Sequence, residues 1–295
     1  MTLALTFGLL AAILWGTTDF LIRIASRRVG VFRAMLYAQA ISAVSIGVWI
    51  AADPLVRTLP AQASAGGWLA AWLAAIAGLT ATVSLYRALH QGRVSVVAPI
   101  AAGYGAVTTL LSWATGERLT GMALLGLGLL IAGVALVSSP SEAKNGTPSD
   151  AAPAPQSHRS GLEWALLSCV CYGLEFWIQG RFANPQLGPL LPVGVYYLLS
   201  TTVLVAFGAT LRLPFRMPAK DAILVFATGL LAIAGFISLS VGFGTGHVAV
   251  VTAIGSVQSA ITVGLACLLT QDRLAVHHWV GLAAVIGGLG LVRLG

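Results

Sequence analysis

The sequence predicts an all-α membrane protein whose ten transmembrane helices form two inverted five-helix repeats around a central cavity. Three observations support this fold class. The 295 residues are 58% hydrophobic and 8% charged, with a mean hydropathy of +0.91, unlike a soluble domain. Apolar segments of about 20 residues, the length that spans a bilayer, occupy most of the chain. The second half also repeats the residue pattern of the first.

The apolar segments predict ten spans, each helical because the bilayer core has no water to satisfy free backbone groups. They cover residues 3–24, 31–52, 66–90, 95–114, 119–138, 160–181, 188–210, 219–243, 248–269 and 276–293. The first span lacks the basic n-region of a secretory signal and leads straight into further spans. We therefore expect it to remain in the mature protein.

One connection is longer than the others and differs in composition. The segment Ser139–Ser160 collects Ser, Pro, Ala, Asn, Gly and charged residues, as flexible linkers do. We therefore divide the chain into a first repeat at 1–138, a linker at 139–159 and a second repeat at 160–295.

The basic residues indicate an orientation rather than a nucleic-acid partner. The net charge is +7, but the basic residues lie at helix ends and form no single patch. Of the 16 Lys and Arg residues, only four lie outside the odd-numbered loops and their flanks: Arg57, Arg118, Arg181 and Arg293. The positive-inside rule then places the odd-numbered loops and the linker in the cytoplasm and both termini outside, in a bacterial inner membrane.

The internal repeat is clearest from the third helix of each half onward. Gly92–Ile100 aligns with Gly246–Ile254. Further matches pair Ala106 with Ala260, Thr108 with Thr262, Glu117 with Asp272, Gly126 with Gly281, Gly133 with Gly288, and Trp15-Gly16 with Tyr172-Gly173. An odd number of spans in each half inverts the second copy, which gives a pseudo-twofold axis in the membrane plane. Transporters use this symmetry to open a midplane site to either side, and the fused halves lead us to expect a functional monomer.

Four short motifs accompany this repeat: Leu14-Trp15-Gly16, Tyr86-Arg87-Ala88-Leu89, Ala98-Pro99-Ile100 and Gly116-Glu117-Arg118-Leu119-Thr120. Together with the ten spans they resemble the EamA-type ten-helix permeases of the drug/metabolite transporter superfamily, over essentially the whole chain. The resemblance implies export of small metabolites, and the most similar members are amino-acid exporters, including the aromatic type. Such relatives are often assigned cytoplasmic termini, and the charge count here departs from that assignment.

Polar side chains within spans are candidate site residues, because exposing them to acyl chains is costly. Thr82, Tyr86 and His90 form one stripe in the third helix, and Ser240 lies on the equivalent face of the eighth. Such faces are expected to line the cavity; the alternative is that they only join neighbouring helices by hydrogen bonds. His90 titrates near neutral pH and is a candidate ligand or proton group, or else an interfacial residue.

Aromatic side chains add flat surfaces that suit a solute with a bulky apolar part. Trp15, Tyr86, Tyr104 and Tyr172 are the candidates, and Gln258 occupies the position equivalent to Tyr104 in the second repeat. The alternative for Tyr and Trp is an interfacial belt.

Asp19 and Glu175 are the acids placed well inside predicted spans, with Gln179 one turn after Glu175. A carboxylate there could take a proton from one side and release it to the other, coupling export to a proton gradient. Asp19 could instead pair with Arg23, one turn away, in a structural role. Glu175 has no cation at i±3 or i±4, which favours a site role.

Other functional classes are less well supported. The chain lacks a G-x-x-x-x-G-K-[ST] loop, so we expect no ATP chemistry, and we expect no cofactor, metal or catalytic residue. The three cysteines make no metal-type spacing and are expected to pack. An intramembrane hydrolase built on Ser256 and His247 is a remote alternative, because Ser256 is followed by Val rather than Gly. Export or flipping of drugs, other metabolites or lipids remains open beside amino acids.

Overall fold

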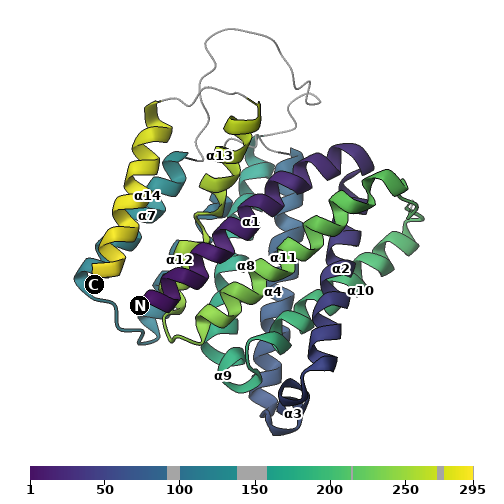
Figure 1. The fold of residues 1–295 in the computed structure, drawn as a ribbon, viewed down its shortest axis with the longest axis horizontal. Coiled ribbons are helices and arrows are strands. Elements are labelled where there is room, and N and C mark those ends of the chain that lie inside the picture. Colours follow the sequence, from purple (N-terminus) through teal and green to yellow (C-terminus); the bar gives the residue numbers. More distant parts are fainter. Residues whose placement is uncertain (92–99, 138–157, 214, 271–275, 295) are drawn as a thin grey trace.

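The computed structural model describes residues 1–91, 100–137, 158–213, 215–270 and 276–294. Some side chains inside these ranges are not described, including those of Tyr86 and His90. The described residues are almost entirely helical and contain no strand (Figure 1). The inter-repeat linker predicted at 139–159 lies almost wholly outside them.

The described residues of the first half form five long or apolar helices and one short helix between the second and third. They are α1 (Thr2–Val29), α2 (Val31–Ala52), α3 (Pro54–Gln62), α4 (Ala65–Gln91), α6 (Tyr104–Ala114) and α7 (Gly121–Val137). Residues 100–102, just before α6, are also helical.

The second half follows the same order with two interruptions. It contains α8 (His158–Ile178), a π-helix (Gln179–Ala183), α9 (Asn184–Leu187), α10 (Leu190–Thr210), a 3-10 turn (Ala219–Asp221), α11 (Ala222–Phe243), α12 (Val248–Gly255), α13 (Gln258–Thr270) and α14 (Val276–Leu294). Across both halves, six helical segments of the described residues are long and apolar enough to cross a membrane, and four are shorter apolar helices. These segments correspond to the ten predicted spans, so the all-helical, multi-span fold class is confirmed.

The structure adds three features that the sequence analysis did not predict. The helix α3 begins after Asp53, whose side chain accepts hydrogen bonds from the backbone N–H groups of Leu55 and Val56. The sixth span widens into the π-helix before it ends. The ninth span is divided into α12 and α13 by a turn at residues 256–257. The last two features lie where the two halves meet.

Helices of one half pack against helices of the other in pairs related by the repeat. The first helix α1 runs along α11, and its counterpart α8 runs along α4. In the same way α2 packs on α11 and α10 on α4, while α6 meets α12 and α7 meets α14. Both chain ends lie at the same end of the bundle (Figure 1). This arrangement is the one expected from two inverted copies.

Two hydrogen bonds make the symmetry visible at atomic detail. The Thr108 hydroxyl donates to the Gly173 carbonyl at 3.0 Å, and the repeat-related Thr262 hydroxyl donates to the Gly16 carbonyl at 3.1 Å. Both glycines are needed for close approach: a Cβ at Gly16 would lie 2.8 Å from the Ile261 Cβ, and one at Gly173 would lie 2.5 Å from the Val107 Cβ. Small residues allow such crossings in membranes.

A second set of glycines joins α7 to α14, which lie side by side at one edge of the bundle (Figure 1). A Cβ at Gly126 would lie 2.8 Å from the Gly288 carbonyl oxygen, and one at Gly133 would lie 2.7 Å from the Gly281 carbonyl oxygen. Gly126 and Gly281 are repeat-related, as are Gly133 and Gly288, so this antiparallel contact is also symmetric. This geometry gives the four glycines a packing role, because small residues let membrane helices approach closely.

Glu117 connects the two halves at the end of the bundle where the chain ends lie. From the loop between α6 and α7, its two carboxylate oxygens accept hydrogen bonds from the Ala249 N–H at 3.2 and 3.1 Å. Ala249 is in the first turn of α12, so the carboxylate satisfies a backbone donor that no residue of that helix could reach. Burial nevertheless raises the pKa of Glu117 above 4.5, although the Ala249 N–H, Ser112 and Arg181 favour its charged form.

We expect Gly133→Ala to destabilise the protein. Its Cβ would lie 2.7 Å from the Gly281 carbonyl oxygen, so α7 and α14 would have to separate, at a cost of roughly 1–3 kcal/mol. Gly128→Ala is the matched control, because no neighbouring atom lies within 4 Å of that Cβ. Thermal unfolding in detergent should show a lowered midpoint for Gly133→Ala alone. Equal midpoints for both variants would contradict the close packing.

We also expect stability to depend on the protonation of Glu117. Because its pKa is raised in the folded protein, the folded state binds this proton more tightly than the unfolded state, so its contribution is present below about pH 4.5 and is lost as the pH rises. Other acids titrate in the same range, so the useful quantity is the difference between wild type and Glu117→Gln. The unfolding midpoint of the wild type, relative to this variant, should fall as the pH is raised. A relative midpoint that rises with pH would show that the hydrogen bonds outweigh burial.

Candidate functional site

An aromatic cluster occupies the centre of the bundle, with Phe176 of α8 in its middle. The Phe176 ring stacks on Trp15 of α1 at a centroid distance of 5.8 Å and on Tyr172 at 6.1 Å. It makes edge contacts with Tyr104 of α6 at 5.4 Å and Phe236 of α11 at 6.1 Å. Both repeats therefore contribute rings to one apolar, π-rich centre. Three candidates from the sequence, Trp15, Tyr104 and Tyr172, come together here.

Trp15 is fixed in this cluster by a hydrogen bond to another helix. Its indole Nε1 donates to the Ala232 carbonyl of α11 at 3.1 Å, and its ring lies over Gly235, where a Cβ would be 2.6 Å from the Trp15 Cδ1. A buried indole N–H that has a partner holds the ring in one orientation. Trp15 is thus held in one orientation against α11, with its ring in the aromatic cluster.

Thr82 joins three helices through hydroxyl groups. Its Oγ1 donates to the Gly78 carbonyl at 2.9 Å and lies 3.0 Å from the Tyr172 hydroxyl and 3.1 Å from the Tyr196 hydroxyl. A threonine has one hydroxyl hydrogen, so both tyrosines are the donors to Thr82. The amide of Gln39 then donates to Tyr196 at 3.2 Å. The polar stripe predicted on the third helix therefore faces the aromatic cluster, at least at Thr82.

Tyr104 and Gln258 occupy equivalent places at two helix breaks. Tyr104 begins α6 after a turn at Gly103, and Gln258 begins α13 after the turn at residues 256–257. In the described part of the structure, the buried Tyr104 hydroxyl and the buried Gln258 Oε1 have no hydrogen-bond partner. Burying a polar group without a partner is costly, so each such atom requires an explanation. Broken helices that meet near the midplane are a recurrent setting for solute sites in transporters.

Asp19 lies on α1 beside this pair of breaks. Its carboxylate is next to the Thr262 hydroxyl and interacts electrostatically with the Tyr104 hydroxyl. The side chain is nevertheless exposed. Acids in the middle of spanning helices almost always face the bundle interior or a water-filled cavity, which makes Asp19 a candidate to line such a space. The alternative partner Arg23 has no described side chain.

Glu175 is buried, with 2% of its surface exposed, and faces α4. A Cβ at Gly78 would collide with its carboxylate, so this glycine provides the room for the acid. Among the described residues, the structure shows no hydrogen bond or ion pair to Glu175. The carboxylate of Glu175 interacts electrostatically with the hydroxyl groups of Tyr104, Tyr196 and Tyr197, which places the acid beside the cluster. An unpaired buried acid is uncommon unless it has a function.

Gln179 and Ser240, two further candidates, satisfy each other. The Gln179 amide donates to the Ser240 hydroxyl at 2.9 Å, the Asn184 amide donates to the same hydroxyl at 3.0 Å, and Ser240 donates to the Pro189 carbonyl at 2.7 Å. This network fastens the π-helix and α9 to α11. The alternative to a cavity-lining role for Ser240 was hydrogen bonding between helices, and this network has that form. The site roles of Gln179 and Ser240 stay predictions.

Tyr86 and His90 are helical in α4, but their side chains lie outside the described residues, so their roles stay predictions. Arg87, between them, lies over the Trp164 ring at 4.7 Å, a cation–π contact near the end of the helix. The hydrolase pair is separated: Ser256 donates to the Ala253 carbonyl at 2.6 Å, and the whole of α12, about 12 Å long, lies between it and His247. No group of described residues could hold a metal ion.

Sequence reasoning missed Phe176, Phe236 and Tyr196 as parts of the site. Aromatic residues in apolar spans carry no signal of their own, because they resemble their lipid-facing neighbours. The useful signal was indirect: Phe236 is the repeat partner of Thr82, and Phe176 adjoins Glu175.

Comparisons with known proteins agree with this geometry. The sequence profile of the EamA-like transporter family matches residues 2–139 and again residues 159–294. A solved structure, described only as "Crystal structure of protein", shares the fold with a TM-score of 0.76 and 20% sequence identity, over 99% of this chain and 96% of that one. Among curated proteins, no sequence matches this chain significantly.

The two family matches cover most of the chain, one in each half. The helices that they cover are those that meet at the aromatic cluster and at the two helix breaks. The chain therefore belongs to the EamA-like transporter family, within the drug/metabolite transporter superfamily.

Proposed function

We propose that this protein is a secondary transporter that exports small amphipathic solutes, and amino acids with aromatic or large neutral side chains in particular. The observation that carries this proposal is the pair of repeat-related atoms, the Tyr104 hydroxyl and Gln258 Oε1, which lack partners at the two helix breaks. Of the two residues, Tyr104 also contacts Phe176 in the aromatic cluster. Polar groups of a solute would satisfy these atoms, while its ring or alkyl chain would pack among the aromatic rings.

Alternating access between the inverted halves is the mechanism that this arrangement supports. The contacts between halves occur in symmetric pairs. Moving one half against the other would therefore close the central site at one end of the bundle and open it at the other end. The two repeats are taken as 1–138 and 160–295. Because one chain contains both halves, we propose that it works as a monomer.

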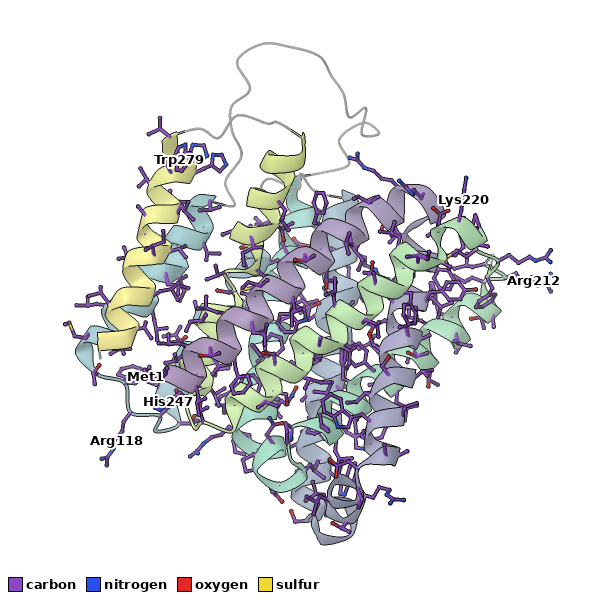
Figure 2. All side chains as sticks on the ribbon, viewed as in Figure 1. Met1, Arg118, Arg212, Lys220, His247 and Trp279 are labelled. Atoms are coloured by element: carbon purple, nitrogen blue, oxygen red, sulfur yellow. The ribbon has the colours of Figure 1, made fainter. Side chains whose placement is uncertain are left out.

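The charge distribution supports an inner-membrane protein with both termini outside. Figure 2 shows Arg212 and Lys220 at one end of the bundle and Arg118 with His247 at the opposite end, where the chain also begins. Arg27, Arg28 and Arg33 belong to the end of α1 and the start of α2, next to Arg216 and Asp221. The more basic end is the cytoplasmic one under the positive-inside rule.

Proton coupling through Asp19 or Glu175 is the energy source that we propose. Glu175 lies buried against Gly78 and has no cation partner in the described structure. Losing a proton would create a buried negative charge, so the free energy of the site would change strongly when a proton binds or leaves. Export driven by the solute's own gradient is the alternative. Drugs, other metabolites and lipids are alternative solutes, because the aromatic cluster would receive their apolar parts equally well.

Labelled amino acids should enter proteoliposomes of the purified protein by counterflow. We expect phenylalanine, tryptophan and leucine to exchange and aspartate to exchange little, because the described residues around the cluster are aromatic rings and the acids Asp19 and Glu175, with no described cation beside them. Empty liposomes and liposomes with heat-denatured protein are the controls. Exchange of none of the amino acids would refute this solute class and would turn attention to drugs, other metabolites or lipids.

An imposed pH gradient should drive accumulation of the same solute in wild type. We expect Glu175→Gln to keep counterflow, which needs no net proton movement, and to lose gradient-driven accumulation down to the level without a gradient. Asp19→Asn tests the second acid in the same assay. Glu163→Gln is the matched control, since this acid lies on the same helix and is exposed. Undiminished accumulation in both the Glu175 and Asp19 variants would exclude coupling through these acids.

A further inference from the structure

A cavity of about 530 Å³ opens at the end of the bundle that carries few basic residues. Its lining does not include Phe176 or the rings of the aromatic cluster described around it. Both repeats line it: Glu117 and Arg118 come from the α6–α7 loop, Arg181 from the π-helix, and His247 from the loop before α12. Figure 2 shows Arg118 and His247 close together at this end. Its size is that of a small-molecule site.

The charges that face this cavity are mainly positive. Arg118 and Arg181 are exposed, and Arg181 makes one long hydrogen bond, of 3.5 Å, to the Thr115 carbonyl. Glu117 is the acid in the lining; its two oxygens share one hydrogen bond from the Ala249 N–H, and its charge also interacts with Arg181. Burial lowers the pKa of His247, so this imidazole adds a neutral polar group at pH 7. Two guanidinium groups therefore face one engaged carboxylate.

The lining also includes apolar side chains, one of which reaches the aromatic cluster. Val241, Phe243 and Val248 are the apolar members that matter here. The Phe243 ring is also 6.4 Å from the Phe176 ring, so one side chain contacts both the cavity and the aromatic cluster. A second independent feature is Asn184, 8% exposed, which lines the cavity and whose Oδ1 has no hydrogen-bond partner among the described residues.

We propose that this cavity is a second binding site, which holds the carboxylate of an amphipathic solute through Arg118 and Arg181 while the apolar part lies against Phe243. Guanidinium groups bind carboxylates through paired, charge-assisted hydrogen bonds. If the protein transports such a solute, this cavity would hold it on its way between the central site and the outside; that role rests on the proposed function. Binding of the carboxylate does not depend on it.

Two matched probes test the charge preference: 3-phenylpropionate and phenethylamine, which share a phenyl ring and a two-carbon chain but carry opposite charges. Equilibrium binding of each radiolabelled probe is measured on the full-length protein in detergent at low salt. We expect 3-phenylpropionate to bind at least about tenfold more tightly than phenethylamine, as one charge-assisted contact would give. Equal affinities, or tighter binding of phenethylamine, would overturn the proposal.

Variants locate the bound carboxylate. Arg181→Gln and Arg118→Gln should each raise the Kd for 3-phenylpropionate about tenfold. Arg57→Gln, an exposed arginine on α3 at the same end but outside the cavity lining, should leave it unchanged. Because these arginines are exposed, the variants should fold, which size-exclusion chromatography checks.

The outcomes separate this site from the central one. Weaker binding in the Arg181 and Arg118 variants, with Tyr104→Phe unchanged, supports the outer site even if no transport is found. Binding that is lost in Tyr104→Phe and unchanged in both arginine variants refutes the outer site and assigns the probe to the aromatic cluster. Equal loss in Arg57→Gln would show nonspecific attraction to positive charge and would also refute it.

Discussion

The structure depends on one constraint: inside a bilayer, polar groups must find their partners within the protein. Side chains meet it by crossing between helices, as when Ser42 donates to the Gly229 carbonyl at 2.9 Å and Ser238 to the Phe7 carbonyl at 2.9 Å. The repeat-related bonds from Thr108 and Thr262 do the same at the two glycine crossings. Each of these bonds joins two helices at a defined point, and the bonds from Thr108 and Thr262 lie in the same spans as the two helix breaks.

Against that background, two of the buried polar atoms without partners are the proposed contacts for a solute. Tyr104 and Gln258 are equivalent by symmetry, both begin a helix, and both leave a buried polar atom unsatisfied in the described structure. Glu175 is accommodated by Gly78 without a compensating charge. These residues surround rings from both halves. A solute bound there would contact each repeat, and its binding could therefore favour one packing of the halves over the other.

Much of this architecture could be predicted from the sequence. The lengths of the apolar segments predict the spans, and the similarity of the two halves predicts the inverted symmetry. The pairing of Thr108 with Thr262 and of Trp15-Gly16 with Tyr172-Gly173 anticipated the two crossings. The π-helix was not predicted, and neither was the turn between α12 and α13, since residues 248–258 contain no proline that would mark a break. Ser240 shows a similar limit of sequence: a polar residue in a span signals a partner, and here the described partners are Gln179 and Asn184, while its site role stays a prediction. Tyr86 and His90 stay predictions.

The most direct measurement is the affinity for the transported solute of Tyr104→Phe and Gln258→Met, taken from the concentration dependence of counterflow. If the unpaired atoms receive polar groups of the solute, each variant should raise the half-saturating concentration about tenfold. Removing a buried polar atom that lacks a partner should at the same time leave the unfolding midpoint unchanged or raise it. Unchanged half-saturating concentrations in both variants, with the protein folded, would contradict the assignment of the central site to these two helix breaks.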